Sequence, residues 1–267
     1  MAVSIEKKYQ KLTDTEHVLL RPGMYVGSIK PHTEEVFLPM KGKDQFQLTE
    51  VTYNPGFLKL FDEIVSNSVD EHKRNIKLNK VKVDIDMSTG QISIWDNGGI
   101  PVKIHKEYDE WVPEMIFSNL KAGSNFDDTE DRVVVGTNGV GSTLTNIFSK
   151  EFIIETCDGK KQFVQTFKNN MSERTKAKIT NKKTAFTKIT YLTDFKRFGL
   201  TGINKNHYLM ITKRLIDIAA CNPTLKIFLN DKPIAFRTFK DYASRYVTPV
   251  FYDQSEHWKI GIGHSTT

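Results

Sequence analysis

Cysteine is scarce in this sequence of 267 residues: the two that occur, Cys157 and Cys221, lie far apart and match no metal-binding spacing. Isolated thiols of this kind favour buried cysteines in a reducing compartment over a disulfide. The seven histidines do not cluster in metal-ligand spacing either, and we expect His72 on the exposed surface of a helix. No run approaches the roughly 18 apolar residues that a membrane span requires, and the first residues lack the apolar stretch of a secretory signal. We therefore expect a cytoplasmic protein with no membrane partner.

Internal repeats and low-complexity tracts are also missing. Hydrophobic residues make up 39% and charged residues 26%, which is ordinary for a globular protein with a sizeable core, in one large domain or two small ones. The net charge of +6 suits a polyanionic partner, but a merely solvated basic surface explains it equally well.

The order of expected elements indicates the fold class. We expect residues 1–50 to form an arm and loops. Asn54 and Pro55 predict the start of a helix that runs to about residue 74, because an Asx cap followed by proline is a typical helix start. Beyond it the sequence predicts a hairpin of strands 81–87 and 92–95, helices at 112–120 and 139–149, strands at 152–156, 162–167 and 186–192, a helix at 204–220, a hairpin turning at 230–231, a short helix near 238–246 and a last strand toward 262. Helices mixed with mostly antiparallel strands indicate an α+β sandwich with the helices on one face.

A polar stripe on the expected helix 55–74 is the first candidate for chemistry. Glu63 and Asn67 are one turn apart, and Asp70 and Glu71 follow on the same side. A carboxylate at the edge of a core can deprotonate or orient a water, and an Asn oxygen one turn on is a suitable ligand for Mg²⁺. Without further context, a solvated helix face is the alternative interpretation.

A second candidate is the turn that begins at Asp96 and continues through Gly98 and Gly99, at the end of an expected strand. An aspartate there can accept a hydrogen bond from an exocyclic amine such as that of adenine. The glycines allow the backbone to turn sharply and to approach a ligand. Taken alone, an ordinary turn explains this segment too.

The third candidate is the glycine-rich segment 136–141, which leads into a helix. Backbone N–H groups before a helix N-terminus form an anion site. The Walker lysine pattern is absent, and the segment does not follow a strand of a βαβ unit, so neither a Walker site nor a dinucleotide site is expected.

The three candidates in this order resemble the sequence boxes of the GHKL ATPases, which include type II topoisomerases, Hsp90-type chaperones, sensor histidine kinases and MutL proteins. Segments 21–27, 55–71, 124–128 and 137–149 resemble type IIA DNA topoisomerases in particular, and eukaryotic and large-phage enzymes more than bacterial gyrase. The resemblance covers residues 9–246. It implies a Bergerat-type ATP-binding fold, and a nuclear location if the chain is eukaryotic.

Carried over by position, the resemblance implies that Glu63 is the general base that activates water for attack on ATP, and that Asn67 is the Mg²⁺ ligand. Asp96 would hold the adenine amine, with Thr187 nearby through water. The implied nucleotide-binding set is Asn67, Asp70, Asp96, Ser124, Asn125, Gly136, Thr137, Asn138, Gly139, Val140, Gly141 and Thr187.

The resemblance also implies partners and a division of the chain. Residues 51–250 would be the ATPase domain, and 251–267 would be the start of a transducer domain whose lysine contacts the γ-phosphate. ATP binding would order the segment 121–138, favour a homodimer and close a gate around DNA, which other parts of the full-length enzyme cleave. Tyr9 in the N-terminal arm would reach the partner's site. Two alternative functions are a nucleotide-switched dimerisation module with little turnover and a MutL-like ATPase.

One departure from the family pattern lies between Gly98 and Gly99, where relatives carry an additional residue that is often arginine. Our hypothesis is that Arg74 or another cation substitutes as the partner of Glu71, or that the turn is reshaped. The basic stretches 174–178 and 182–183 are expected in a loop that either contacts DNA phosphates or is simply solvated.

Overall fold

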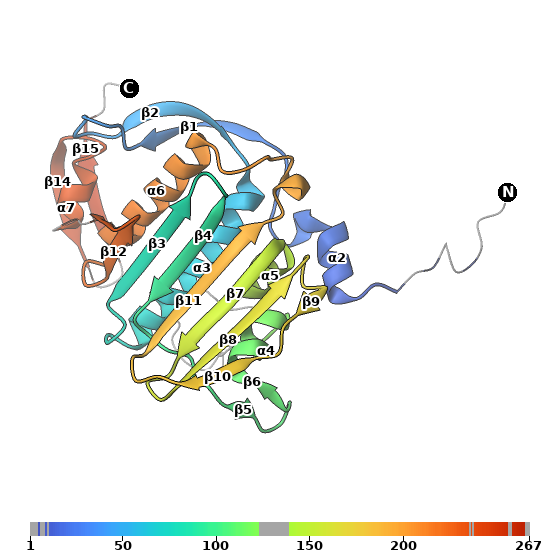
Figure 1. Ribbon diagram of the computed structural model, residues 1–267. Coiled ribbons are helices and arrows are strands. Elements are labelled where there is room, and N and C mark those ends of the chain that lie inside the picture. The colour runs from blue at the N-terminus through green and yellow to red at the C-terminus, as the bar shows by residue number, and fades with distance from the viewer. Residues whose placement is uncertain are drawn as a thin grey trace.

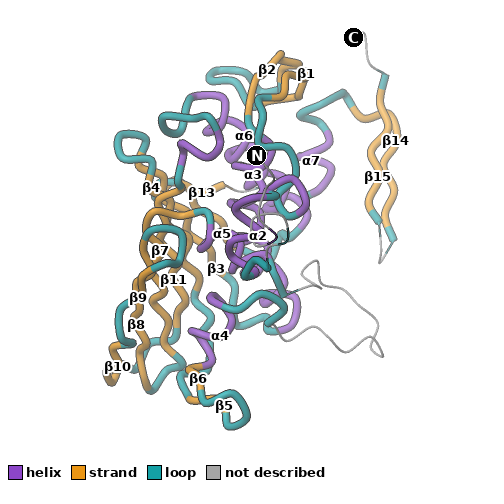
Figure 2. Tube along the Cα trace, turned by 90° about the vertical axis from the view of Figure 1, so that its right-hand side faces the viewer, coloured by secondary structure: helices purple, strands orange, loops and turns teal. Residues whose placement is uncertain are grey.

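The computed structural model describes residues 5, 9, 11–122, 139–234, 236, 238–255 and 258–264. Its centre is a nine-stranded sheet with helices packed on one face (Figures 1 and 2). Figure 2, a view along the plane of the sheet, shows the strands of this sheet in one layer and the helices in a second. The expected α+β sandwich with helices on one face is confirmed.

The strand order is β10-β8-β7-β11-β4-β3-β12-β13, with β9 paired to β8. Every neighbouring pair is antiparallel except β12 and β3, which run parallel. Strands β4 and β11 lie in the middle, so polar residues on their helix-facing side lie against the core. The strands are β3 (Lys80–Asp86), β4 (Gln91–Asp96), β7 (Ser149–Cys157), β8 (Lys161–Lys168), β9 (Glu173–Arg174), β10 (Lys178–Asn181), β11 (Phe186–Thr193), β12 (Lys226–Leu229) and β13 (Lys232–Ile234).

Helix α3 (Pro55–Arg74) carries the polar stripe and forms for local reasons. The Asn54 side chain accepts a hydrogen bond from the backbone N–H of Phe57 at 3.0 Å, and proline occupies the first turn. Its other face is buried against the sheet; each large apolar side chain there contributes roughly 1.5–3 kcal/mol. Tertiary burial therefore stabilises this helix more than helix propensity does. The buried apolar residues of α3 are Phe57, Leu60, Phe61, Ile64, Val65 and Val69.

The described helices that follow α3 are α4 (Val112–Ser118), α5 (Gly141–Ile147), α6 (Lys205–Cys221) and α7 (Phe239–Ala243), with a short 3₁₀ segment η2 (Phe195–Phe198). Of these helices, α5 and α6 pack on α3. Helix α5 also packs on α4. The expected helices and strands are confirmed, with ends shifted by up to a few residues.

The expectation of an arm and loops for residues 1–50 is wrong for the described part. This region contains α2 (Asp14–Leu20), the 3₁₀ segment η1 (Pro22–Met24) and an antiparallel pair, β1 (His32–Leu38) and β2 (Gln47–Tyr53). A capping box between Thr13 and Glu16 starts α2. Both strands are largely exposed, so they lack the alternation of apolar and polar residues that reveals a strand in sequence.

The basic stretch expected as a loop contains the edge strand β10 and part of β9. Two short hairpins complete the described chain: β5 (Ile104–His105) with β6 (Glu110–Trp111), and β14 (Pro249–Gln254) with β15 (Lys259–Gly263). None of the described helices is long and apolar enough to cross a bilayer.

Candidate functional site

Three elements meet where the sequence predicts the site: helix α3, the C-terminal end of β4 and the N-terminal end of α5. The described members of the predicted set are Glu63, Asn67 and Asp70 on α3, Asp96 at the end of β4, Thr187 on β11, and Gly139, Val140 and Gly141 at the start of α5. The predicted residues Ser124, Asn125, Gly136, Thr137 and Asn138 lie outside the described residues.

Asp96 is the buried acceptor of the site, with only 7% of its surface exposed. The Ser68 hydroxyl donates a hydrogen bond to its Oδ2 at 2.7 Å, and the backbone N–H of Gly98 donates to its Oδ1 at 2.9 Å. These two donors fix the carboxyl plane. A carboxylate oxygen can accept more than one hydrogen bond. Asp96 therefore retains acceptor capacity for a ligand.

The environment of Asp96 raises the pKa of its carboxyl group to about 6. Burial is the largest cause, because removal from water disfavours the charged form, and the charge of Glu71 acts in the same direction. The hydrogen bonds from Ser68 and from the Gly98 and Thr187 backbones oppose the shift. A carboxyl group with a pKa displaced toward neutrality at the end of a strand is typical of a functional site.

Thr187 lies directly opposite Asp96 in the β11–β4 ladder and opposite Thr156 in the β11–β7 ladder. Its hydroxyl oxygen is 3.0 Å from that of Thr156, and both side chains are buried. Strand register therefore places Thr187 beside Asp96.

Glu63 lies beside the first residue of α5. Its Oε2 is 1.6 Å from the point where a Cβ at position 141 would be, so only glycine fits at Gly141 without displacing the carboxylate. On its other side, Oε1 forms an ion pair with Lys59 Nζ at 2.5 Å, one turn earlier on α3. The packing of α5 and the lysine together fix the carboxylate.

Asn67 differs from its neighbours because it is exposed, and in the described part of the chain its amide has no hydrogen-bond partner. Asp70, three residues further, is almost completely buried. Glu71 is 3.9 Å from Arg74 in an ion pair at the end of the helix. This contact is the one that our substitution hypothesis for the missing arginine requires.

The turn after Asp96 is packed tightly. A Cβ at Gly99 would be 2.2 Å from the carbonyl oxygen of Cys157, so glycine is required there by the close approach of β7. The Asn97 side-chain oxygen accepts hydrogen bonds from the backbone N–H groups of Asn79 and Lys80, at 3.0 and 2.9 Å. These contacts hold the turn against the start of β3.

The two ends of the segment 123–138 are adjacent in space, because the backbone N–H of Ala122 donates to the carbonyl of Gly139 at 3.2 Å. Gly139 has φ +58°, a left-handed conformation that favours glycine, just before α5 begins. Gly139 and Val140 thus lead directly into α5 at the site.

Sequence reasoning missed Lys59, Ser68 and Thr156. The one-turn spacing of Lys59 and Glu63 is a signal that could have revealed their ion pair. Ser68 carries no such signal, because its partner lies on β4.

The interpretation of His72 as an exposed surface residue is wrong. Its side chain is buried, with Nδ1 hydrogen-bonded to the Leu78 carbonyl oxygen.

This fold, with a buried strand-end aspartate facing a helix that carries Glu63, defines a domain of the GHKL ATPase class. Two solved structures are similar over almost the whole chain. The ATPase and transducer domains of DNA topoisomerase II from Balamuthia mandrillaris match with 36% identity and a TM-score of 0.94, covering 98% of this chain and 70% of that one. The ATPase region of Saccharomyces cerevisiae topoisomerase II matches with 35% identity and a TM-score of 0.90, covering 94% and 69%.

Curated relatives agree. DNA topoisomerase 2 of Acanthamoeba polyphaga mimivirus is 42% identical over 99% of this chain, and that of Arabidopsis thaliana is 42% identical over 95%. The chain belongs to the type II DNA topoisomerase family and corresponds to its ATPase region. It spans about a fifth of the length of these curated relatives, 22% and 17%.

Two further comparisons add little to the family relationship. The ATPase domain of Thermus thermophilus gyrase B is 21% identical with a TM-score of 0.62, a likeness of fold alone. No protein-family profile matches the chain.

Proposed function

We propose that this chain binds Mg·ATP at the site between α3, β4 and α5 and hydrolyses it, as the ATP-driven part of a type II DNA topoisomerase. The observation that carries the proposal is the pair of fixed carboxyl groups along α3: Asp96, which accepts from Ser68 of this helix, and Glu63, which lies nearer the helix N-terminus. One is buried with free acceptor capacity, and the other is held in place beside the glycine-rich start of α5.

Adenine recognition is assigned to Asp96. Its ionised carboxylate accepts a hydrogen bond from the exocyclic amine. The Ser68 hydroxyl and the Gly98 N–H keep the plane of the carboxylate fixed. Thr187 and Thr156 supply hydroxyl groups beside it that position a bridging water. A base without an amine at that position leaves a buried acceptor unpaired, which gives selectivity for adenine.

Water activation is assigned to Glu63. Its carboxylate accepts a proton from the water that attacks the γ-phosphate, and the ion pair with Lys59 fixes the orientation of the carboxylate. Because phosphoryl transfer requires little covalent chemistry from the protein, positioning of this group is its main contribution. The close contact between Gly141 and Glu63 makes the position of α5 part of the catalytic geometry.

The available ligands fit a magnesium ion that arrives with the nucleotide. The described residues contain no group of three or more His, Cys, Asp or Glu side chains that could hold a metal by themselves. Asn67 offers one exposed amide oxygen, and Mg²⁺ commonly takes one or two protein oxygens together with phosphates and waters. When bound, the ion would neutralise charge on the phosphates; Asn67 would hold it.

For the full-length protein we propose ATP-dependent homodimerisation, closure of a gate around DNA and cooperation with a separate DNA-cleaving region. Residues 51–250 would form the ATPase domain and 251–267 the start of a transducer domain. Closure would be a population shift caused by contacts that the nucleotide makes in the closed state alone. Membership of the topoisomerase family removes the MutL-like alternative. A dimerisation module with little turnover remains as an outcome of the experiment.

The test is phosphate release and nucleotide binding by Glu63→Gln, with Asp62→Asn as the matched control. Asp62 is the neighbouring carboxylate on α3, but it forms an ion pair with Arg214 on α6 and does not face α5. We expect Glu63→Gln to bind ATP normally and to lose about 100-fold or more of its turnover, whereas Asp62→Asn keeps both. Equal turnover in Glu63→Gln and wild type would refute the base assignment. Sizing with a non-hydrolysable ATP analogue measures dimerisation; a dimer without measurable turnover would favour the switch module.

A further inference from the structure

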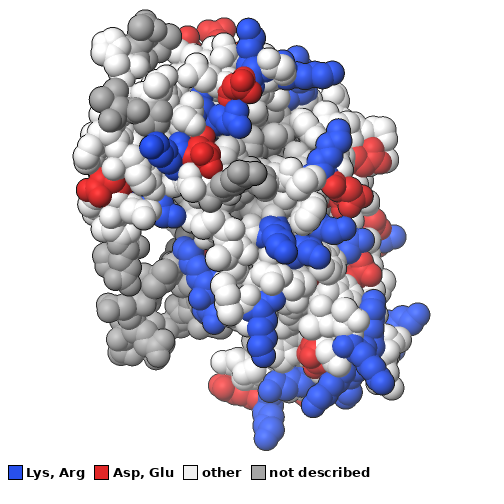
Figure 3. All heavy atoms as spheres, turned by 90° about the vertical axis from the view of Figure 1, so that its left-hand side faces the viewer, with Lys and Arg blue, Asp and Glu red and all other residues white. Residues whose placement is uncertain are grey.

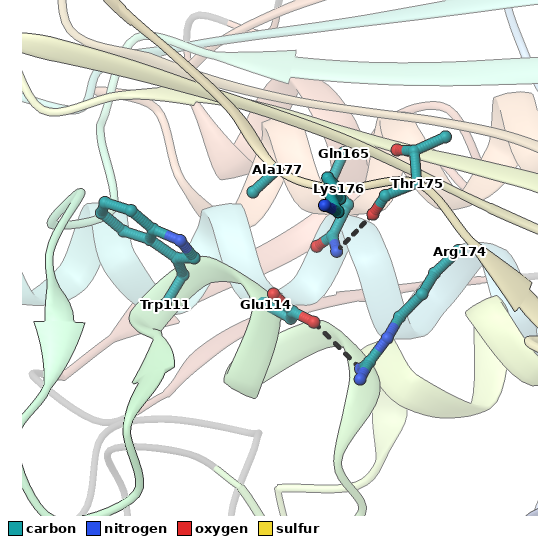
Figure 4. A pocket seen from close by; sticks show the side chains of 7 residues that line it. All are labelled: Trp111, Glu114, Gln165, Arg174, Thr175, Lys176 and Ala177. Atoms are coloured by element: carbon teal, nitrogen blue, oxygen red, sulfur yellow. Dashed lines mark hydrogen bonds and ion pairs between the residues drawn. The ribbon is translucent and has the colours of Figure 1, made fainter.

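A cavity lies away from the Asp96 site, on the helix-bearing side of the sheet between β8 and α4. Its volume is about 390 Å³, which is within the range of small-ligand pockets. Figure 4 shows its wall: an indole ring on one side, an ion pair on the other, and an amide between them. The lining residues are Trp111, Glu114, Gln165, Arg174, Thr175, Lys176 and Ala177.

Gln165 contributes a buried amide to this wall, with one of its two polar atoms satisfied. The side chain is only 2% exposed, and its Nε2 donates to the Thr175 carbonyl oxygen at 3.1 Å. Its Oε1 is buried and has no hydrogen-bond donor among the described residues. Buried acceptors almost always have a partner, because an unmade hydrogen bond is costly. A ligand that presents an N–H to Oε1 would supply the missing donor.

The other walls define the shape and charge of that ligand. Trp111 is half-buried, and its ring packs on Phe163 with 6.3 Å between centroids, so it offers a fixed aromatic wall. Arg174 forms an ion pair with Glu114 at 2.9 Å, and the exposed Lys176 adds an uncompensated positive charge. A flat ring with an N–H edge and a negatively charged substituent matches this combination.

The edge of the sheet around the cavity is strongly basic. Strand β10 is the outermost strand of the sheet. The turn before β8 and the turn after β10 carry further cations. They are joined by a hydrogen bond of 3.1 Å from the Lys182 N–H to the Lys160 carbonyl oxygen. None of the exposed lysines there has an ion-pair partner within the described residues. Figure 3, which views the molecule from the side of β14 and β15, shows Lys and Arg side chains gathered at its lower end. These lysines are Lys160, Lys161, Lys176, Lys178, Lys182 and Lys183.

We propose that this cavity binds an unstacked nucleobase, independently of the Asp96 site. The base stacks on Trp111 and donates an N–H to Gln165 Oε1, while its phosphate lies against Arg174 and Lys176. Stacking on an aromatic ring combined with a basic track for the backbone is the general mode of single-strand binding. The same chemistry is available from a free nucleotide or from one nucleotide of a single strand. The unpaired lysines that continue the charge along the edge favour the strand.

The first measurement follows Trp111 itself, without altering the cavity. The variant Trp95→Phe/Trp258→Phe leaves Trp111 as the sole tryptophan of the three in the chain. Thymidine 5′-monophosphate and a 12-nucleotide oligo(dT) are then titrated and the fluorescence is recorded. We expect quenching, at lower nucleotide concentration for the oligonucleotide. Equal potency per nucleotide would assign the site to free nucleotides. Absence of quenching by both probes would overturn the proposal.

The second measurement compares strands by fluorescence anisotropy at low salt. We expect labelled oligo(dT) to bind at least about tenfold more tightly than a duplex of the same length, because a paired base cannot enter the cavity. Trp111→Leu and Gln165→Met should each weaken single-strand binding by about 5- to 100-fold. Trp95→Leu, on the opposite face of the sheet, is the control and should leave it unchanged.

Two outcomes separate the cavity from a general basic surface. If strand and duplex bind equally and the Trp111 and Gln165 variants have no effect, the basic edge alone binds nucleic acid and the proposal is wrong. Thermal melting by circular dichroism checks that each variant is folded. Should Trp111→Leu fail to fold, the fluorescence titration and Gln165→Met still decide the question.

Discussion

Because Asp96 is buried, we predict that its ionised carboxylate lowers the free energy of unfolding of this chain at neutral pH. The perturbation is Asp96→Asn, which removes the charge and keeps the shape of the side chain. An amide at this position can still accept the Gly98 N–H with its oxygen, and the Ser68 hydroxyl can rotate to accept from its nitrogen. The variant therefore tests the cost of the buried charge with little other change.

The magnitude follows from the raised pKa of Asp96. The pKa is about 6 in the folded chain against a reference value of 3.8, and each pKa unit corresponds to about 1.4 kcal/mol. The protonated form is therefore favoured by folding, and the stability it contributes is complete below pH 4. That contribution is lost as the pH rises through about 6. The free energy of unfolding of Asp96→Asn minus that of the wild type should thus increase by about 3 kcal/mol between pH 4 and 7 and then level off.

The assay is urea denaturation of both proteins at intervals of half a pH unit. Other titrating groups affect both proteins alike, so the difference isolates Asp96. In parallel, ATP binding at pH 7.5 should be at least about tenfold weaker in the more stable variant, because the acceptor that we propose for adenine is altered. A difference in unfolding free energy that does not vary with pH would refute the reasoning, since it would mean that Asp96 ionises as easily in the folded chain as in the unfolded one.

Three further predictions concern the same site. Gly141→Ala would place a Cβ 1.6 Å from Glu63 Oε2, so turnover should fall by about 100-fold or more with a smaller loss of ATP affinity, measured by phosphate release and calorimetry; unchanged turnover would contradict the contact. Asn67→Ala should remove most of the Mg²⁺ dependence of nucleotide binding, whereas a magnesium titration identical to that of the wild type would exclude Asn67 as a ligand. Inserting arginine between Gly98 and Gly99 should leave ATP affinity nearly unchanged, and a large gain in a binding titration would disprove the substitution hypothesis.

The stability cost at Asp96 and the tight contact at Gly141 have the same structural origin. Helix α3 contacts both sites, because its Ser68 hydrogen-bonds Asp96 of β4 and its Glu63 lies against Gly141, and its apolar face anchors it in the core. Functional groups commonly reduce stability in this way, and the surrounding core compensates for the loss.

Much of the site could be predicted because its signals are local. The cap at Asn54 and the proline after it start α3, the apolar period orients the helix, and the Glu63–Asn67 spacing follows from one helical turn. Asp96 at a strand end followed by glycines was likewise visible in a few consecutive residues. These features depend on interactions within about four residues, so the sequence is sufficient to predict them.

The remaining features depend on contacts between distant segments. The β1–β2 pair was missed because neither strand has a buried face that would leave an alternating pattern. His72 was misassigned because its partners, Leu78 and Thr224, come from a turn and from a segment about 150 residues away. The folded chain buries this imidazole between elements that the local pattern cannot bring together.

The sequence by itself determined which residues are candidates for chemistry in this protein, namely a helix with Glu63 and Asn67, an aspartate at a strand end and a glycine-rich entry to a helix. Only the tertiary structure decided their state: it buried Asp96 and raised its pKa, seated Glu63 against Gly141, and placed Thr187 opposite Asp96 through strand register. The physical reason is that residue type and short spacing are encoded locally. Burial, register and close packing exist only when segments far apart in the chain are brought together.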